Sequence, residues 1–258
     1  MLKDRIRAAL HSPHPWRRLF HFAGGLVLTS LPVSFRRRLF RGERYRCPVC
    51  GSSLRGFLPL HRPYHRYCPV CWSLQRHRLV WLLFERRQLW EEGQGRFLHV
   101  APEPALAAYF RQHVASYVSL DRYARAQVKM DVMRLGFPDG AFDFVYCSHV
   151  LEHIPDDRRA MAEFYRILRP GGRAVILVPI LRERTFEDPS ITSPVERERL
   201  FGQFDHLRAY GPDFADRLRG AGFEVEPITA PMLASEAEIE TMGLPGADEE
   251  TIFLCTKR

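Results

Sequence analysis

The chain has 258 residues, of which 46% are hydrophobic, and its formal net charge at pH 7 is +8. This length accommodates one α/β domain with a small appendage and an ample core. Residues 1–46 carry eleven Lys and Arg residues against two acidic ones, a net charge of about +9, so the rest of the chain is nearly neutral. A basic arm of this kind suits phosphates of nucleic acid, an anionic membrane surface or an acidic glycan, and charge alone does not choose among them.

The apolar stretch Phe20–Phe35 contains two glycines, a proline and a histidine, and it is too short to span a bilayer. We therefore expect no transmembrane helix. We also expect no signal peptide, because the apolar run starts late and no clear cleavage pattern follows it. The cysteine pattern does not require an oxidising compartment, so the sequence predicts a cytoplasmic protein. Peripheral membrane contact through residues 20–38, which arginines flank, is an alternative.

Three helices are predicted before residue 93. Leu2–Leu10 and Phe35–Phe40 are short and basic, and we assign neither to the core. Leu74–Trp90 is amphipathic and is expected to connect two parts of the chain over residues 74–92. Its apolar side consists of Leu79, Leu82, Leu83, Leu89 and Trp90, and the side chains expected to face water are Arg78, Glu85, Arg86 and Arg87.

Four of the six cysteines form two Cys-Pro-Val-Cys pairs, Cys47 with Cys50 and Cys68 with Cys71, separated by seventeen residues. Two thiolate pairs at this separation can converge into a tetrahedral Zn²⁺ site with no open position, so this metal would be structural. The pattern predicts a small zinc ribbon over residues 47–73, after a basic arm over residues 1–46. Two disulfides, four free thiols, or a ligand supplied by His61 or His65 are the alternatives. The two remaining cysteines, Cys147 and Cys255, lie in predicted strands and are expected to be buried thiols.

Basic and aromatic residues are interleaved in and after this ribbon. Such a pattern suits stacking on bases and pairing with phosphates, and it equally suits packing of a small ribbon against its neighbour. We favour packing. The basic residues are Arg55, Arg62, Arg66, Arg76 and Arg78, and the aromatic residues are Phe57, Tyr64, Tyr67 and Trp72.

The stretch 138–180 predicts a strand, a helix and a second strand. Phe142–Cys147 is a short apolar run bounded by turn residues, which is typical of a buried strand. Asp156 and Asp157 favour a helix N-terminus, and apolar residues then recur at helical spacing as far as Leu168. Pro170-Gly171-Gly172 is expected to stop this helix before the strand Ala174–Val178. The unit is βαβ, with both faces of its sheet covered.

The last part of the chain has a charged segment, a helix and two strands. Residues 181–204 follow a strand end and are rich in charge and turn residues, so we interpret them as a lid or insertion over an active site. A helix is predicted over residues 212–222, and strands at Phe223–Pro227 and Thr251–Thr256. His206, Arg208 and Tyr210 alternate before that helix, so an extended backbone would point all three the same way, as in an acceptor-binding set.

The ordered set FDFVYCSHVLEHI, ILRPGG and AVILVP closely resembles the central part of class I S-adenosylmethionine-dependent methyltransferases of the type 11-like kind. The resemblance implies a Rossmann-like, seven-stranded α/β sheet over residues 93–258 with an antiparallel last strand. The run EDPSITSPVERERLFGQFDHLRAYG is similar to bacterial methyltransferases that pair a zinc ribbon with this domain. An ordinary crossover in another Rossmann-like enzyme is the alternative.

The resemblance also implies a set of cofactor residues. In the family the turn after the first strand is rich in glycine, whereas here Ala101, Glu103 and Ala105 occupy the glycine positions, and His99 occupies the place of the usual acid. Glu103 could itself accept a hydrogen bond from the ammonium of the methionine moiety. By the same resemblance Asp121 holds the ribose hydroxyls and Asp131 accepts from the adenine amino group. Val132 would lie beside the adenine ring, and Ser148 ends the strand that lines the cleft.

The candidate catalytic residues are histidines near the predicted point of methyl transfer. His149 and His153 follow the strand Phe142–Cys147, and ligands of such sheets bind at the carboxyl ends of the strands. A histidine suits proton removal from an acceptor at neutral pH, although His153 could equally cap or pack the turn. His206 and Tyr210 complete the candidate set.

These observations predict an S-adenosylmethionine-dependent methyltransferase with a structural zinc ion. Its acceptor is an O or N atom of a sugar, glycan or other small molecule in the first hypothesis. In the second hypothesis the acceptor is RNA, of the ribosomal type, bound by the arm and the ribbon. In the third, the protein is a non-catalytic binding protein whose cofactor loop has degenerated.

Overall fold

The computed structural model describes residues 28, 30–59, 66–89, 95–123, 126–246 and 249–258. These residues form two compact units, one before and one after the boundary between Trp81 and Leu82, except that Glu236–Pro245 belongs to the first unit. The helix predicted at Leu2–Leu10 and most of the apolar stretch from Phe20 lie outside the described residues. Across the described part of the chain, no helix has the length and apolar character that a membrane span requires.

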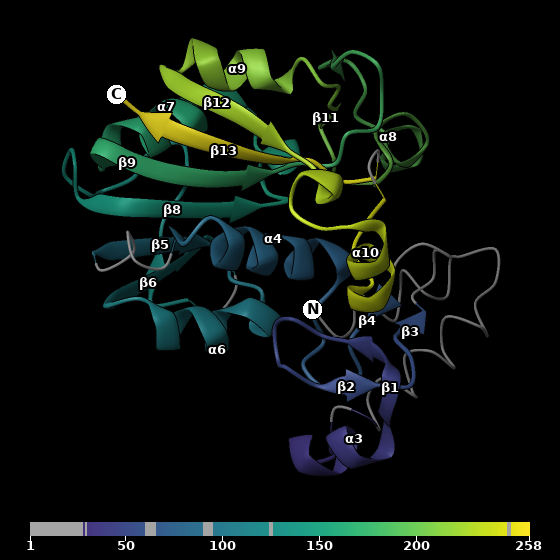
Figure 1. Ribbon diagram of the computed structural model, residues 1–258. Helices are drawn as coiled ribbons and strands as arrows, with labels where there is room; N and C mark the ends of the chain where they lie inside the picture. Colours follow the sequence, from purple (N-terminus) through teal and green to yellow (C-terminus); the bar gives the residue numbers. More distant parts are fainter. Residues whose placement is uncertain (1–27, 29, 60–65, 90–94, 124–125, 247–248) are drawn as a thin grey trace. The chain divides into compact units, whose positions relative to one another are not determined.

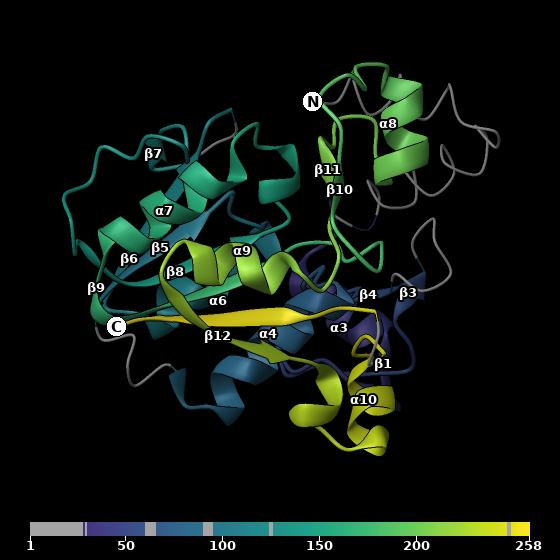
Figure 2. The same cartoon turned by 90° about the horizontal axis from the view of Figure 1, so that it is seen from above.

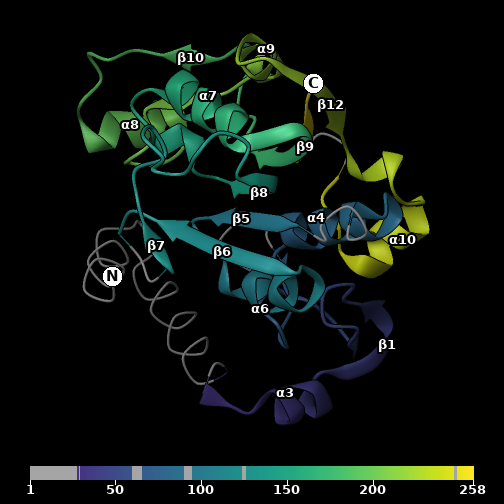
Figure 3. The same cartoon turned by 90° about the vertical axis from the view of Figure 1, so that its left-hand side faces the viewer.

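The second unit is built on a seven-stranded sheet with the strand order β12-β13-β9-β8-β5-β6-β7. β13 is antiparallel to both of its neighbours and the other pairs are parallel. Figure 1 and Figure 3 show this order. The predicted seven-stranded sheet and its antiparallel last strand are confirmed. The strands are β5 (Arg96–Val100), β6 (Ser116–Asp121), β7 (Val128–Lys129), β8 (Phe142–Ser148), β9 (Leu168–Leu177), β12 (Phe223–Ile228) and β13 (Ile252–Lys257).

Helices cover the two faces of this sheet, α6 (Pro104–His113) on one and α7 (Asp157–Ile167) with α9 (Phe214–Gly220) on the other (Figure 2). Alternate residues of β5 and β8 serve the two faces. Phe97 and Phe144 stack 5.3 Å apart and contact Phe110 of α6 or Phe84. The apolar residues of β5 and β8 that alternate with Phe97 and Phe144 belong to a larger apolar core, which also contains residues of α7 and α9. Cys147 and Cys255 are buried in this core, as the sequence predicts.

The boundary between α7 and β9 differs from the sequence-based prediction. Asp156 caps α7 as expected, because its carboxylate accepts the backbone N–H of Arg159 at 2.9 Å. The helix ends at Ile167, however, and β9 begins at Leu168, so Pro170, Gly171 and Gly172 lie within the strand rather than before it. The pairing of β9 with β8 has a register shift at this place, so the strand accommodates these residues as an irregularity. The backbone is tight there, because a Cβ on Gly172 would approach the carbonyl oxygen of Arg169 to 2.8 Å.

Residues 181–210 form a folded insertion with its own secondary structure. β10 (Phe186–Glu187) pairs antiparallel with β11 (Arg208–Ala209), and α8 (Pro194–Phe201) lies between them in the sequence. α8 ends at Gly202, whose φ of +88° is in the left-handed region that glycine adopts without strain.

The first unit extends the predicted ribbon at both ends. It contains α3 (Val33–Leu39), the antiparallel pairs of β1 (Arg41–Arg46) with β2 (Ser53–Leu54) and β3 (Leu58–Pro59) with β4 (Arg66–Tyr67), and α10 (Glu236–Met242). Arg37 of α3 donates to Ser52 Oγ at 3.2 Å and to the Cys50 carbonyl at 3.4 Å. The last part of the basic arm is therefore a folded part of this unit.

The prediction that Arg78 faces water is wrong. Arg78 lies in α4 (Gln75–Arg86), is fully buried, and donates to the carbonyl oxygens of Ser73, Met242 and Gly243. The planar guanidinium satisfies several acceptors at once, which makes burial of its charge tolerable. The other three residues assigned to the exposed side of this helix, Glu85, Arg86 and Arg87, are exposed.

Arginines of the first unit lie over aromatic rings of the same unit. The guanidinium of Arg78 is 4.1 Å from the ring centroid of Phe57, that of Arg36 is 5.3 Å from Trp72, and Tyr67 stacks on Trp72 at 5.1 Å. These contacts agree with the packing interpretation of the interleaved residues. Arg62 and Tyr64 lie outside the described residues.

Arg208 of β11 anchors the segment 181–210 to the rest of the second unit. Its buried guanidinium donates to the carbonyl oxygens of Leu151, Ile154 and Pro155 at 3.0, 2.5 and 2.9 Å. Its Nε also donates to Glu187 at 2.8 Å. Hydrogen bonds from Arg217 and Arg208 lower the pKa of Glu187 to about 2, against a raising effect of partial burial. One side chain thus fixes the turn that follows β8.

We expect Arg208→Lys to lower the free energy of unfolding by about 2–4 kcal/mol, since an ammonium cannot reach three carbonyls and a carboxylate together and leaves buried acceptors unpaired. Urea denaturation measures this change. Arg219→Lys is the matched control, because Arg219 pairs with Asp216 on the surface, and it should change the stability by less than about 0.5 kcal/mol. Equal effects of the two substitutions would contradict the anchoring role.

Candidate cofactor and acceptor site

The candidate site lies where β5, β6 and β8 end. β5 pairs in parallel with both neighbours, and Val100 is opposite Leu120 on β6 and Cys147 on β8. The residues that follow these strands therefore meet at one edge of the sheet, which is where ligands bind in open α/β sheets. Ala101, Asp121 and Ser148 all lie at this edge, as the sequence predicts.

The turn after β5 keeps the backbone of a glycine although it contains none. Ala101 has φ of +48°, in the left-handed region that glycine favours. Its N–H donates to the carbonyl of Leu120 at 2.7 Å, which fixes the turn against β6. Position 101 therefore differs from the glycine-rich pattern in its side chain but not in its backbone conformation.

A buried polar network replaces the acid expected at position 99. His99 is fully buried, and its Nε2 lies 2.6 Å from Glu103 Oε2 and its Nδ1 2.9 Å from the Tyr117 hydroxyl. Burial raises the pKa of Tyr117, so its hydroxyl is a donor at neutral pH. Tyr146 donates to the other oxygen of Glu103 at 3.2 Å. The carboxylate is thus supplied from the turn, by Glu103, and His99 orients it.

The two predicted nucleoside acids lie in neighbouring turns linked by Arg122. Asp121 ends β6, and its Oδ1 accepts the N–H of Tyr123 at 2.6 Å. Asp131 accepts the N–H of Met133 at Oδ1 and a guanidinium N–H of Arg122 at Oδ2, both at 2.9 Å. Both acids thus also stabilise local turns. Each oxygen has a second lone pair, which can accept a further hydrogen bond from a ligand. Val132 is buried beside Asp131.

Ser148 and His149 end β8 in a strained arrangement. Ser148 is buried, and its hydroxyl has no hydrogen-bond partner within the described ranges. His149 has φ of +54°, which is costly for a residue with a side chain and recurs at functional sites. Its Nε2 lies 3.2 Å from Glu250, and its Nδ1 lies 3.5 Å from Glu152. Glu250 had no signal in the sequence, because it lies about a hundred residues further on.

His153 and His206 come together although fifty-two residues separate them. Their rings meet edge to face with centroids 4.7 Å apart. His153 ends the 3₁₀ turn η1 (Leu151–His153), and His206 is held where the backbone N–H of Leu207 donates to the carbonyl of Glu152 at 2.8 Å. Burial lowers the pKa of His206. The turn after β8 carries His149 and His153, and the fold brings His206 against His153.

Tyr210 lies apart from these histidines. It is fully buried, and its hydroxyl donates to Asp157 at 2.7 Å, at the start of α7. His206, Arg208 and Tyr210 each contact a residue of the segment 151–157, and their role as an acceptor-binding set stays a prediction. In this segment Arg208 donates to the carbonyl oxygen of Leu151, and Tyr210 donates to the carboxylate of Asp157.

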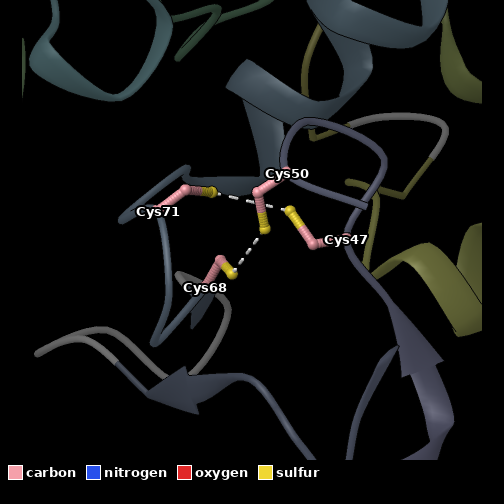
Figure 4. A group of neighbouring side chains, drawn as sticks. All are labelled: Cys47, Cys50, Cys68 and Cys71. Atoms are coloured by element: carbon pink, nitrogen blue, oxygen red, sulfur yellow. Dashed lines mark hydrogen bonds between the residues drawn. The ribbon is translucent and has the colours of Figure 1, made fainter. Parts of the chain in front are cut away.

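The four N-terminal cysteines converge in the first unit (Figure 4). The Sγ atoms of Cys47 and Cys71 are 3.7 Å apart, and those of Cys50 and Cys68 are 3.8 Å apart. All four are free thiols, at a separation far above the length of a disulfide. Four bonds of about 2.3 Å to a tetrahedral Zn²⁺ would space the sulfurs by about 3.8 Å. The four sulfurs could therefore hold such an ion.

The two Cys-Pro-Val-Cys turns have the same backbone. In each, the N–H of the residue after the second cysteine donates to the carbonyl of the first, Gly51 to Cys47 and Trp72 to Cys68, both at 2.9 Å. Gly51 and Trp72 both have positive φ, +67° and +65°. Glycine adopts this conformation without strain, whereas Trp72 adopts it with a side chain.

We expect Ala101→Gly to keep or raise the free energy of unfolding, by up to about 1 kcal/mol. The left-handed conformation costs alanine about 1–2 kcal/mol, and glycine loses about 0.4–1 kcal/mol through its more flexible unfolded chain. Ala101→Val should instead destabilise, because a β-branched residue tolerates this φ poorly. Chemical denaturation of the three proteins decides the matter, and a loss of stability in Ala101→Gly would argue against strain at this turn.

Comparisons with known proteins agree with this architecture. A family described as Methyltransferase domain matches residues 85–176. The chain is 35% identical over 99 residues to O-methyltransferase cnsE of Penicillium expansum, and 32% identical over 100 residues to 27-O-demethylrifamycin SV methyltransferase of Amycolatopsis mediterranei. These matches cover 38% and 37% of this chain and 34% of each relative, so the chain spans about a third of the length of these relatives.

A solved structure shows the same fold. It is a candidate sarcosine dimethylglycine methyltransferase from Galdieria sulphuraria, with a TM-score of 0.50 and 14% sequence identity. The alignment covers 75% of this chain and 92% of that protein. At this identity the likeness concerns the fold alone.

Proposed function

We propose that this chain transfers a methyl group from S-adenosylmethionine to an acceptor bound at the carboxyl ends of β5, β6 and β8. The match of residues 85–176 to the family described as Methyltransferase domain supports this proposal. The observation that carries the proposal is the position of Asp121 at the end of β6, next to the turn of Ala101. A carboxylate there can accept two hydrogen bonds at once, as two ribose hydroxyls require.

The backbone of the turn after β5 argues for a working cofactor site over a degenerate one. A site that had lost its ligand would have no reason to keep alanine in a left-handed conformation, and Ala101 keeps it. Glu103, held by His99 and Tyr146, presents a carboxylate suited to the ammonium of the methionine moiety. Asp131 and Val132 would then accept from the adenine amino group and contact its ring.

S-adenosylmethionine supplies a methyl group that is activated by its bond to a sulfonium. The acceptor atom attacks the methyl carbon in line with this bond, and the sulfur leaves. The chain's own contribution is to position both partners and, where the acceptor carries a proton, to remove it. Ser148, His149, His153 and His206 surround the strand end where the acceptor would lie. The folded insertion over residues 181–210 covers the turn that carries two of these histidines, which favours a role as a lid.

We favour a small-molecule acceptor with a reactive oxygen. Two of the similar proteins are named as methyltransferases of oxygen atoms. The RNA hypothesis depends on the basic arm and ribbon, but Arg36, Arg55 and Arg78 contact aromatic rings of their own unit. A sugar or another hydroxylated small molecule suits the site better.

We expect Asp121→Ala to weaken S-adenosylmethionine binding at least tenfold, because both ribose hydroxyls lose their acceptor. Isothermal titration calorimetry with the full chain measures the affinity. Asp216→Ala is the matched control, since Asp216 is an exposed acid paired with Arg219, and it should leave the affinity unchanged. Absence of binding to the wild-type protein would refute the cofactor assignment.

We further propose that Cys47, Cys50, Cys68 and Cys71 bind one structural Zn²⁺. The spacing of the sulfurs and the two matching turns support this assignment. The hydroxyls of Ser52 and Ser73 lie within hydrogen-bond distance of the sulfurs, where they can orient these ligands. Such a closed site stabilises the fold and takes no part in methyl transfer.

Replacing the bound ion with Co²⁺ should produce the strong near-ultraviolet absorption of thiolate-to-metal charge transfer, because all four ligands are sulfurs. Cys68→Ser should lose much of this absorption and unfold at a lower temperature. Cys255→Ser is the control, as this cysteine is buried in the second unit and should keep the spectrum. A wild-type spectrum without thiolate absorption would contradict the zinc ribbon.

A further inference from the structure

Glu152 is a buried carboxylate whose burial needs an explanation. Its exposed fraction is 1%, and neither of its oxygens has a hydrogen-bond partner in the described part of the chain. The Nδ1 of His149 lies 3.5 Å from Oε1 of Glu152. A buried carboxylate is normally paired or bound to a metal.

Two imidazoles lie beside this carboxylate. Glu152, His153 and His206 each offer one ligand atom, and these atoms lie within 4.8 Å of one another. The Nδ1 of His206 lies 2.9 Å from the carbonyl oxygen of Phe201, so it carries the proton and leaves Nε2 with a free lone pair. Asp205 lies 3.4 Å from His153 Nδ1. Metal-binding histidines are typically oriented by such carbonyl and carboxylate partners.

We propose that Glu152, His153 and His206 bind a Zn²⁺ ion that is separate from the cysteine site. Two imidazoles and one carboxylate are the donor set of zinc sites that keep an open coordination position, in contrast to a closed set of four sulfurs. The carboxylate would offset part of the charge of the ion, which accounts for its burial without a hydrogen bond. The fold assembles the set, because β11 and the turn η1 are joined through Arg208 and Leu207.

The open position gives this ion a role that rests on the proposed function. The site lies on the turn after β8, where the acceptor would bind. A hydroxyl oxygen bound to the ion would lose its proton to solvent more readily, and the resulting alkoxide or phenolate would attack the methyl carbon as the carbon–sulfur bond breaks. The neutral thioether S-adenosylhomocysteine leaves. The acceptor class is then a hydroxylated small molecule, and His153 and His206 serve as ligands rather than bases.

Zinc content of the full chain, measured by elemental analysis after dialysis against a low free Zn²⁺ concentration, tests the proposal. The wild-type protein should hold about two equivalents, one in each site. Glu152→Gln and His206→Gln should each lose about one equivalent and keep the cysteine-bound ion. Cys68→Ser should also lose about one, but from the other site. His113→Gln is the matched control, because His113 lies exposed on α6, and it should keep both.

Circular dichroism checks that each variant is folded, and His153→Gln, at a partly exposed side chain, replaces either variant that is not. Calorimetry with S-adenosylmethionine on the same proteins separates this proposal from the proposed function. Intact cofactor binding with only one zinc equivalent in the wild-type protein would overturn the second metal site alone. The same zinc content in wild-type, Glu152→Gln and His206→Gln proteins would also overturn it.

Discussion

The parallel pairing of β5 with β6 and β8 is the constraint on which the candidate site depends. Because the three strands run in register, Val100, Leu120 and Cys147 are neighbours, and the chain leaves the sheet three times at one edge. Backbone dipoles and unpaired groups at such an edge favour ligands, and side chains that follow the strands point into the same region. Ala101, Asp121 and His149 owe their proximity to this register and to nothing in their local sequence.

The polar groups at this edge are supported by burial from both faces. On one face, His99 and Tyr146 lie among Phe97, Phe110 and Phe144, so their hydrogen bonds to Glu103 are shielded from water and correspondingly strong. On the other face, Arg208 donates to three carbonyl oxygens of the turn after β8. It does not donate to the carboxylate of Glu152, which lies in the same turn. Rigid support of one turn and an unsatisfied carboxylate within it are what distinguish a binding site from ordinary packing.

The first unit illustrates the same division between local and long-range effects. Its two Cys-Pro-Val-Cys turns form the same hydrogen bonds because the short motif dictates them. Burial of Arg78 is a different matter, since its acceptors include Met242 and Gly243, which come from far along the chain. The helical pattern of the local sequence predicts that this arginine faces water. It is buried because residues 236–245, which are distant in the sequence, pack over it.

The sequence by itself determined β8, β12, β13 and the apolar part of β9, the start of α7, the burial of Cys147 and Cys255, and the convergence of the four N-terminal cysteines. These features follow from apolar runs, capping residues and short spacings, which act over a few residues. The tertiary structure alone decided that His99 and Tyr146 contact Glu103, that Glu250 approaches His149, and that His153 meets His206. Such contacts join residues distant in the chain, and they depend on strand register and the docking of an insertion, which no local pattern encodes.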